Sequence, residues 1–347
     1  MENPKIEDLL VVGAGLSGLA CARTAAQAGL KPLLVDRSSA VGGRCASKPV
    51  SPELPPWDFG PVFWHGDANE LGALTKLVGE DDLLPWPLQV KGVGLPCQPE
   101  AFEEGQFRRA IISGLRRWPE VLARDLAVKS GVLAQKLSWT AEGVSLVTDQ
   151  GILHARDLVL ALAPEQTQEV LENSLAEEPQ LASSIALLRQ FSSLPSLTLL
   201  AWYASGPELP WDVWYPETSR EVLLISNEAR KRHFPSGSAL VIQARPGWSE
   251  SRLNADRSMW AKELLESAAR LAGPWVQSPD KWLAHRWKFA RRAPGDGLKP
   301  LVLTKPGSPG RVAVTGELFD SGGLASAFRA GERTAQKLLN VKGRPQH

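Results

Sequence analysis

The chain of 347 residues contains little of what marks several large classes of protein. Its three cysteines, Cys21, Cys45 and Cys97, have no CxxC spacing, so they indicate neither a disulfide framework nor a zinc site. Positive and negative charges nearly cancel, leaving +1, which excludes the strongly basic footprint of a nucleic-acid-binding protein. No apolar run reaches the roughly 18 residues needed to span a membrane.

Residue patterns for metal or nucleophilic catalysis are also missing. The five histidines show no ligand spacing, and no paired carboxylates or serine–histidine–aspartate arrangement stands out. The apolar stretch 9–22 follows Glu2, Glu7 and Asp8 rather than a basic segment, so it does not resemble a signal peptide. We therefore expect a cytoplasmic protein with reduced cysteines, no metal, and neither a nucleic-acid nor a membrane partner.

What the sequence does contain is concentrated in the stretch Leu9–Arg44. An apolar run meets Gly13-Ala14-Gly15-Leu16-Ser17-Gly18, and a helix of small residues follows. A second apolar run, Pro32–Val35, then ends in Asp36. This is the order of a dinucleotide-binding βαβ unit, in which glycines admit the pyrophosphate to the helix N-terminus and the acid binds a ribose.

A second glycine pair follows this unit. Gly42-Gly43-Arg44 allows close backbone approach to a phosphate or ribitol, while Arg44 supplies charge-assisted hydrogen bonds. GxGxxG, a terminal acid and GGR together resemble the FAD-dependent amine oxidase superfamily. The stretch Trp57–Gly66 is similar to that superfamily's D-x-G-P segment, which runs past the flavin ring.

Two further segments resemble the renalase-like branch of the superfamily. They are Gly247-Trp248-Ser249 and His285-Arg286-Trp287-Lys288-Phe289-Ala290, and the chain length also suits this compact branch. The second segment alternates with period two, as in a strand, which puts His285 and Trp287 on one face. From the residues alone, this alternation fits an aromatic pocket wall or an ordinary half-buried strand.

The C-terminal block completes the resemblance. A strand over 312–315 ends in Gly316-Glu317, and Gly322-Gly323-Leu324-Ala325-Ser326-Ala327 and an alanine-rich helix up to about Leu339 follow. The carboxylate could hold ribitol hydroxyls, and the helix N-terminus could stabilise negative charge on the reduced flavin. No cysteine lies near this helix, so the resemblance implies noncovalent FAD.

The fold class implied is α/β. We expect a Rossmann-like FAD-binding domain of p-hydroxybenzoate-hydroxylase-like (GR2-type) topology and a second α+β substrate domain built on an antiparallel sheet. The discontinuous FAD-binding domain takes 1–66, 98–164 and 286–347, and the substrate domain takes 67–97 and 165–285. Helices are predicted over 16–28, 68–78, 106–123, 165–189 and 256–271. Strands are predicted over 126–128, 132–137, 144–148, 152–154, 157–163, 197–203, 213–215, 222–226 and 239–244.

The candidate residues fall into two sets. Those expected to bind FAD are Gly13, Gly15, Leu16, Ser17, Gly18, Asp36, Arg37, Gly43, Arg44, Asp58, Phe59, Gly60, Val132, Gly316, Glu317, Gly323, Leu324 and Ala327. By resemblance, the backbone near Val132 contacts the adenine. Those expected to line the catalytic pocket are Trp64, His65, His285 and Trp287.

The resemblance implies an oxidase of small molecules. Isomeric 2- and 6-dihydro forms of NAD(P) would give a hydride to flavin N5, and O₂ would reoxidise the flavin to yield hydrogen peroxide. Hydride loss from a dihydropyridine needs orientation and desolvation rather than a protein base. Two alternatives stay open: an amine oxidase acting on CH–NH bonds, and a flavin-binding protein without turnover.

Overall fold

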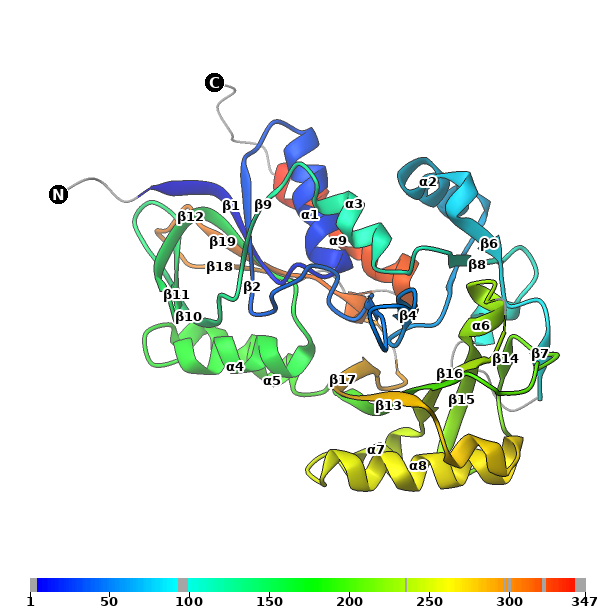
Figure 1. Cartoon of the computed structure of the whole chain (residues 1–347). Coiled ribbons are helices and arrows are strands. Elements are labelled where there is room, and N and C mark those ends of the chain that lie inside the picture. The colour runs from blue at the N-terminus through cyan, green and yellow to red at the C-terminus, as the bar shows by residue number, and fades with distance from the viewer. Residues whose placement is uncertain are drawn as a thin grey trace. The chain divides into compact units, whose positions relative to one another are not determined.

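The computed structural model describes residues 5–92, 99–234, 236–295, 297–298, 301–319 and 323–340. The chain divides into two compact units. Unit 1 comprises 1–43, 119–193 and 292–347, and unit 2 comprises 44–118 and 194–291. Figure 1 shows the elements of each unit by label. Cys97, Gly322 and the basic tail 342–347 lie outside the described residues.

Unit 1 is built on a parallel sheet in the order β9-β2-β1-β12-β19. The antiparallel strands β10 and β11 continue from the first half of β12, and β18 pairs antiparallel with β19. Continuous burial of strands such as Pro32–Asp36 explains their unbroken apolar sequence. The strands are β1 (Ile6–Val12), β2 (Pro32–Asp36), β9 (Ala127–Ser130), β10 (Ala134–Trp139), β11 (Val144–Thr148), β12 (Gly151–Leu160), β18 (Leu301–Thr304) and β19 (Arg311–Val314).

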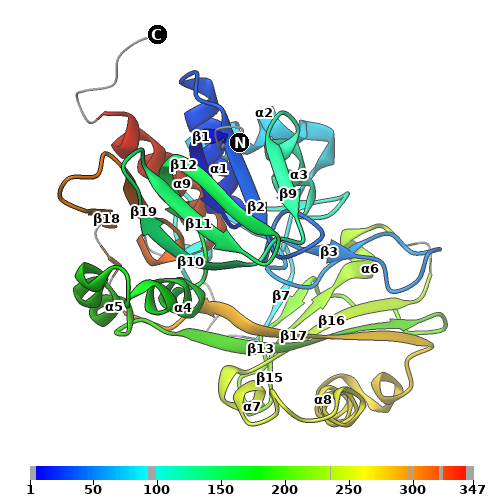
Figure 2. The ribbon, with the colours of Figure 1, turned by 90° about the vertical axis from the view of Figure 1, so that its left-hand side faces the viewer.

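The helices of unit 1 form two groups. Helix α1 (Leu16–Gln27) packs along α9 (Gly323–Leu339), as Figure 1 shows. Helices α4 (Pro164–Ser174) and α5 (Ala182–Leu188) bury their apolar residues with Leu10, Val12 and Leu160 of the sheet. Figure 2 shows α4 and α5 side by side near β10. A 3₁₀ turn, η3 (Pro179–Leu181), joins them, and another, η5 (Glu317–Phe319), precedes α9.

Unit 2 contains a six-stranded sheet in the order β17-β13-β16-β15-β14-β7. The pairs β13–β16, β16–β15 and β15–β14 are antiparallel, and β7 joins β14 in parallel. One face packs on α8 (Arg257–Ala272), and the other packs on aromatic residues that include Trp57 and Phe63. The strands are β7 (Val90–Lys91), β13 (Ser193–Tyr203), β14 (Val213–Trp214), β15 (Val222–Asn227), β16 (Ser238–Ala244) and β17 (Lys281–Arg292).

Two small sheets complete unit 2. Strand β3 (Ser47–Lys48) pairs with β4 (Trp57–Asp58), and β8 (Phe107–Ile111) lies between β5 (Trp64–Gly66) and β6 (Leu83–Pro85). The remaining elements are α2 (Ala68–Val78), η1 (Glu80–Asp82), η2 (Pro99–Phe102), α6 (Glu228–Lys231), α7 (Pro246–Glu250) and η4 (Pro274–Gln277). Helix α3 (Arg117–Ala123) spans the boundary between the two units.

The predicted helix over 106–123 is wrong. Its first part is strand β8, and only the last turns form α3. Gly114, with φ +106°, breaks the segment, and Ile111 pairs with Leu83 of β6 in the small sheet. Phe107, at the start of β8, is exposed, whereas Ile111, at its end, is buried.

Most other predicted elements are present. Helices over 16–28, 68–78 and 256–271 and all four antiparallel strands over 197–244 are confirmed within a few residues. The separate strands over 152–154 and 157–163 form one strand, β12. The packing units divide the chain differently from the predicted domains, because 44–66, 98–118 and 286–291 belong to unit 2 and 165–193 to unit 1. The ligand of each unit stays a prediction.

Candidate functional site

The glycine loop of unit 1 has the geometry that close backbone packing requires. Gly13 has φ +104°, and a Cβ there would lie 2.4 Å from the Ala161 carbonyl oxygen at the end of β12. A Cβ on Gly18 would lie 1.9 Å from the Gly13 carbonyl oxygen. Both positions therefore exclude any other residue. Gly15 differs, because a Cβ there would meet no protein atom within 4 Å.

Helix α1 begins directly after Gly15, which has φ −78° and an extended ψ. No side chain caps this N-terminus, and no acidic residue lies in its first turn. The first backbone N–H groups, at Leu16 and Ser17, thus lie at the positive dipole end of a helix that has neither a side-chain cap nor an acidic residue in its first turn. Such an end, approached over a glycine with open space around it, suits a phosphate group.

Asp36 lies at the end of β2, beside this loop. One carboxylate oxygen accepts from the Ala14 N–H at 2.7 Å, and the other accepts from the Ser38 N–H at 2.7 Å. Each oxygen has a further lone pair that a ribose hydroxyl could use. The Val132 N–H donates to the Asp36 carbonyl oxygen at 2.9 Å, so Val132 lies beside the acid. Arg37 is exposed.

The second glycine pair lies against the first loop. The Gly42 N–H donates to the Ala14 carbonyl oxygen at 2.8 Å, and Gly42 forms an isolated bridge with Gly15. Gly43 has φ +55°, and a Cβ there would be 3.4 Å from the Gly15 Cα. The two glycine motifs, separated in sequence, therefore lie against each other through the backbone of Gly15, Gly42 and Gly43.

The C-terminal motif supplies a third part of unit 1. The Thr315 N–H, just after β19, donates to the Leu160 carbonyl oxygen at 3.0 Å. The Thr315 hydroxyl is buried without a hydrogen-bond partner among the described residues, which is uncommon for a buried polar group. Gly316 has φ +148°, and Glu317 begins η5. Thr315 was not predicted from the sequence, and only its place beside Gly316 could have suggested it.

Helix α9 is fitted tightly to α1. Gly323 has φ +84° at its start, and Leu324 and Ala327 are buried. A Cβ on Gly331 would lie 2.1 Å from the Ser17 carbonyl oxygen and 2.9 Å from the Ala20 Cβ. Gly331 thus lets the last helix approach the first turn of α1, a role that sequence reasoning missed.

In unit 2, Gly60 allows another close backbone approach. A Cβ there would lie 2.0 Å from the Arg44 carbonyl oxygen. The Arg44 guanidinium donates to the Ala290 carbonyl oxygen of β17 at 3.4 Å. Arg44 and Gly60, both candidates from the sequence, are therefore neighbours in one unit.

Asp58 lies in a buried ionic network that the sequence did not predict. Its carboxylate accepts from Arg232 (2.8 Å), Lys231 (3.3 Å), the Ser47 hydroxyl (2.6 Å) and the Leu115 N–H (2.8 Å). Burial acts to raise the pKa of Asp58, but the charges of Arg232 and Lys231 and these hydrogen bonds outweigh it, so the pKa is lowered. Four donors thus occupy the Asp58 carboxylate.

The network contains two cations and two anions, since Glu228 joins Asp58. Lys231 donates to Glu228 at 2.5 Å and to the Val62 carbonyl oxygen at 2.7 Å, and its ammonium lies 4.2 Å from the Trp86 ring centroid. The side chains of Lys231, Glu228 and Asp58 are fully buried. These contacts tie several loops of unit 2 to α6.

Three aromatic residues of unit 2 form a cluster, which we call the aromatic cluster: Phe59, His285 and Trp287. The Phe59 and Trp287 rings stack with their centroids 5.3 Å apart, and the centroids of the His285 and Trp287 rings are 4.3 Å apart. The Trp287 indole N–H donates to the Phe59 carbonyl oxygen at 2.8 Å, which fixes the ring. Both predicted residues of β17 therefore meet a residue of the D-x-G-P segment.

The aromatic cluster has a cationic surrounding. The Lys48 ammonium lies 4.6 Å from the Phe59 ring centroid. Burial, followed by the charges of Lys48 and Arg257, lowers the pKa of His285 to about 4, so its imidazole is neutral near pH 7. Burial and the Arg257 charge also lower the pKa of Lys48. Among the described residues, no ion pair joins Lys48 or Arg257 to a carboxylate.

Trp64 and His65 lie on β5, paired with Arg109 and Arg108 of β8. Trp64 is buried, and His65 Nε2 is 4.0 Å from Glu100. Within the described part of the chain, no ring contact joins them to His285 or Trp287. The described residues also contain no cluster of three potential metal ligands, and no described helix is long and apolar enough to cross a bilayer.

Comparison with known proteins agrees with this architecture. Residues 11–77 match the family of NAD(P)-binding Rossmann-like domains. The putative protoporphyrinogen oxidase from Exiguobacterium sp. 255-15 is similar at a TM-score of 0.71 and 14% identity, over 97% of this chain and 99% of that one. The predicted Rossmann-like domain with a second domain on an antiparallel sheet is thereby confirmed.

Two amine oxidases share the fold over nearly their whole length. Putrescine oxidase bound to putrescine has a TM-score of 0.67 at 15% identity, covering 97% of this chain and 100% of its own. Cyclohexylamine oxidase from Brevibacterium oxydans IH-35A has a TM-score of 0.66 at 15% identity, covering 96% and 99%. At such identities the similarity extends to the fold, and the chemistry must be argued from this chain's own residues.

Proposed function

We propose that this chain is an FAD-dependent oxidoreductase whose substrate is an anionic dihydropyridine of the NAD(P) isomer type. Unit 1 would hold the cofactor noncovalently: the α1 N-terminus its pyrophosphate, Asp36 its adenosine ribose, and Thr315 with Glu317 its ribitol. When bound there, FAD would supply a two-electron hydride acceptor that O₂ can reoxidise, with hydrogen peroxide as the product.

The residues of unit 1 fit such a cofactor. The space beside Gly15, the uncapped end of α1 and the unpartnered Thr315 hydroxyl are features that protein packing alone leaves unexplained. A pyrophosphate would place negative charge at the α1 N-terminus, and a polyol would give the Thr315 hydroxyl a hydrogen-bond partner.

The observation that carries the substrate assignment is the cationic surrounding of the aromatic cluster. Planar rings such as Phe59 and Trp287 suit a flat heterocycle. Lys48 and Arg257 add positive charge beside His285, which is itself neutral. This arrangement attracts a phosphate-bearing dihydropyridine and repels a protonated amine.

The chain's own residues would act by orientation. A dihydropyridine loses hydride without a protein base, so the task is to hold its ring flat and exclude water. The fixed Trp287 indole supplies a rigid surface, and neutral His285 can donate or accept one hydrogen bond to a ring substituent.

The experiment is anaerobic mixing of the purified, FAD-loaded protein with 2- and 6-dihydro-NAD(P), ordinary NADH and a panel of amines. Rapid loss of flavin absorbance with the isomers is expected, and Lys48→Met should raise the concentration needed for half-maximal rate. Bleaching by an amine alone would contradict the dihydropyridine assignment and support a second candidate, an amine oxidase, which the names of the similar structures favour.

A matched pair of variants tests the cofactor site. Gly15 has an ordinary φ and open space, so Gly15→Ala should fold normally yet bind FAD more weakly because the methyl group meets the cofactor. Gly72→Ala, on α2 with nothing near its Cβ, is the control. Unchanged FAD affinity in Gly15→Ala would contradict this site. If FAD binds but no compound reduces it, the third reading, a flavin-binding protein without turnover, replaces the enzyme.

A further inference from the structure

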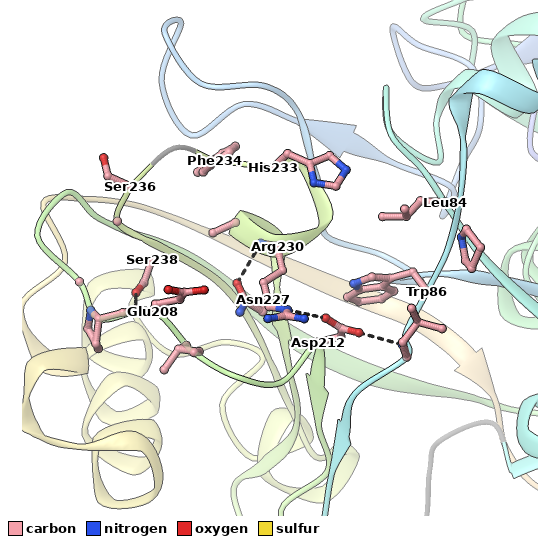
Figure 3. Close-up of a pocket in the computed structure, with 17 residues that line it drawn as sticks. Leu84, Trp86, Glu208, Asp212, Asn227, Arg230, His233, Phe234, Ser236 and Ser238 are labelled. Carbon is pink, nitrogen blue, oxygen red and sulfur yellow. Dashed lines mark hydrogen bonds and ion pairs between the residues drawn. The ribbon is translucent and has the colours of Figure 1, made fainter.

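A cavity of about 600 Å³ lies within unit 2, and none of its lining residues belongs to the glycine loops or to the aromatic cluster. It is formed by residues before β7, the turn after β13, and α6 with the segment that follows it. Its volume is that of a small-molecule site. Figure 3 shows Asp212, Arg230, His233 and Trp86 around this opening.

Arg230 is held in a fixed orientation at the cavity. Its Nε donates to the Asp212 carboxylate at 2.8 Å, and the second Asp212 oxygen accepts from the Leu88 and Gln89 N–H groups at 2.8 and 2.9 Å. The Asp212 side chain is 5% exposed, whereas the Arg230 side chain is 39% exposed. The buried carboxylate therefore holds one edge of the Arg230 guanidinium. The other two guanidinium nitrogens have no hydrogen-bond partner among the described residues.

Trp86 provides a second donor. It is 2% exposed, and its indole N–H has no hydrogen-bond partner among the described residues. In Figure 3 the nitrogen-bearing edge of the indole is turned toward the side of Arg230. A buried donor without an acceptor is costly, so an acceptor in this cavity would stabilise it.

His233 adds an unusual backbone. Its φ is +52°, the one positive value among the described residues other than glycine, and the residue is exposed at the cavity. A conformation of this kind in a non-glycine residue is a reason to look for function nearby. Besides Asp212, the lining contains a second acidic residue, Glu208, which is exposed.

The rest of the lining combines apolar side chains with the polar residues Asn227, Ser236 and Ser238. Leu84, Leu209 and Phe234 contribute to the wall, and Leu88 is 69% exposed beside it. A ligand here therefore meets charged and N–H donors together with apolar side chains.

We propose that this cavity binds a small organic monocarboxylate with a flat apolar body, its carboxylate accepting hydrogen bonds from Arg230 and the Trp86 indole. Guanidinium groups bind carboxylates through paired N–H donors, and Asp212 orients this one without filling its outer edge. The site is separate from the aromatic cluster and does not depend on the proposed oxidoreductase activity.

The probe is benzoate, titrated by calorimetry into the full-length, FAD-loaded protein. We expect saturable binding, at least tenfold weaker binding of neutral benzamide, and a shift of the Trp86 indole N–H signal in NMR, assigned with Trp86→Phe. Arg230→Gln should weaken benzoate binding by about tenfold to a hundredfold, because a hydrogen bond to a charged group is lost.

Two controls make the result specific. Arg189→Gln removes another exposed arginine that is ion-paired, here with Glu172, and should leave benzoate affinity unchanged. Glu208→Gln should strengthen binding slightly, because it removes a nearby negative charge. The NMR shift in the unmodified protein provides the test if Arg230→Gln does not fold.

Three outcomes would overturn the proposal. They are no saturable binding, equal affinity in Arg230→Gln and the unmodified protein, and loss of binding in Lys48→Met with retention in Arg230→Gln. The last would assign benzoate to the aromatic cluster instead.

Discussion

The buried network around Lys231 offers the sharpest test of how unit 2 is held together. Lys231→Met removes one of its two cations and leaves Asp58 and Glu228 with Arg232 alone. The variant keeps much of the side-chain volume, so the change is mainly one of charge. It also leaves the Val62 carbonyl oxygen without this donor.

The expected cost follows from burial. The Lys231, Glu228 and Asp58 side chains have no exposed surface, so the excess negative charge is screened poorly by water. Removing one partner of a buried ion pair typically costs about 3–5 kcal/mol. The remaining donors, Ser226 to Glu228 and Ser47 to Asp58, place the expected loss near the lower end, about 3 kcal/mol.

The assay is urea unfolding followed by circular dichroism, with FAD present at a saturating concentration. Lys136→Met is the matched control, because Lys136 pairs with Glu177 at 2.6 Å but both side chains are largely exposed. The Lys136–Glu177 pair should contribute less than about 1 kcal/mol to the free energy of unfolding. The double variant Lys231→Met/Glu228→Gln restores charge balance and should be more stable than Lys231→Met alone.

A loss in Lys231→Met no larger than in Lys136→Met would refute this reasoning. Strict additivity would refute it as well. If Lys231→Met/Glu228→Gln loses as much stability as Lys231→Met and Glu228→Gln lose in sum, then the two charges do not interact.

Three more results are expected. The Asp58 carboxyl has a lowered pKa in the folded state, so its contribution to stability is complete above roughly pH 4 and is lost as pH falls through the folded pKa. In urea titrations at several pH values, Asp58→Asn should therefore make the free energy of unfolding depend less on pH in the acid range. His285 has its pKa lowered to about 4, so its contribution is present above its unfolded value of about 6.5 and declines as pH falls toward 4; NMR should give that low value, and Lys48→Met should raise it, whereas a titration near 6.5 in the unmodified protein would contradict the aromatic cluster as described. Gly331→Ala should destabilise the protein by about 1–3 kcal/mol because its methyl group meets the Ser17 carbonyl, whereas Gly72→Ala should be neutral or stabilising by up to about 1 kcal/mol; equal urea midpoints would contradict the close approach of α9 and α1.

The glycine loop could be predicted from sequence because each of its parts is local. Gly13, Gly18 and Asp36 lie within one βαβ unit, and their spacing has a single common structural explanation. The same holds for α8, where Asp256 caps the helix and Gly273 ends it. Here a short window of sequence contains all the partners that matter.

The residues that were missed depend on distant partners. Lys231 and Arg232 look like an ordinary charged helix end, and only the folding of Asp58 against them shows that they are buried. Gly331 is one small residue among several in α9, and its role depends on Ser17 at the other end of the sequence. The spacing of apolar residues in β8 predicted a helix. The segment forms a strand instead because it pairs with β5 and β6, which are distant in sequence.

The contact between Gly331 and Ser17 has a consequence for biosynthesis. Helix α1 and the glycine loop are translated about 300 residues before the Thr315–Glu317 segment and the helix α9 that covers α1. On the ribosome, the βαβ unit therefore has one side of α1 uncovered until α9 has emerged. Stable binding of a dinucleotide would then wait for α9, and a chain arrested before α9 would bind the cofactor poorly even with every glycine of its first motif intact.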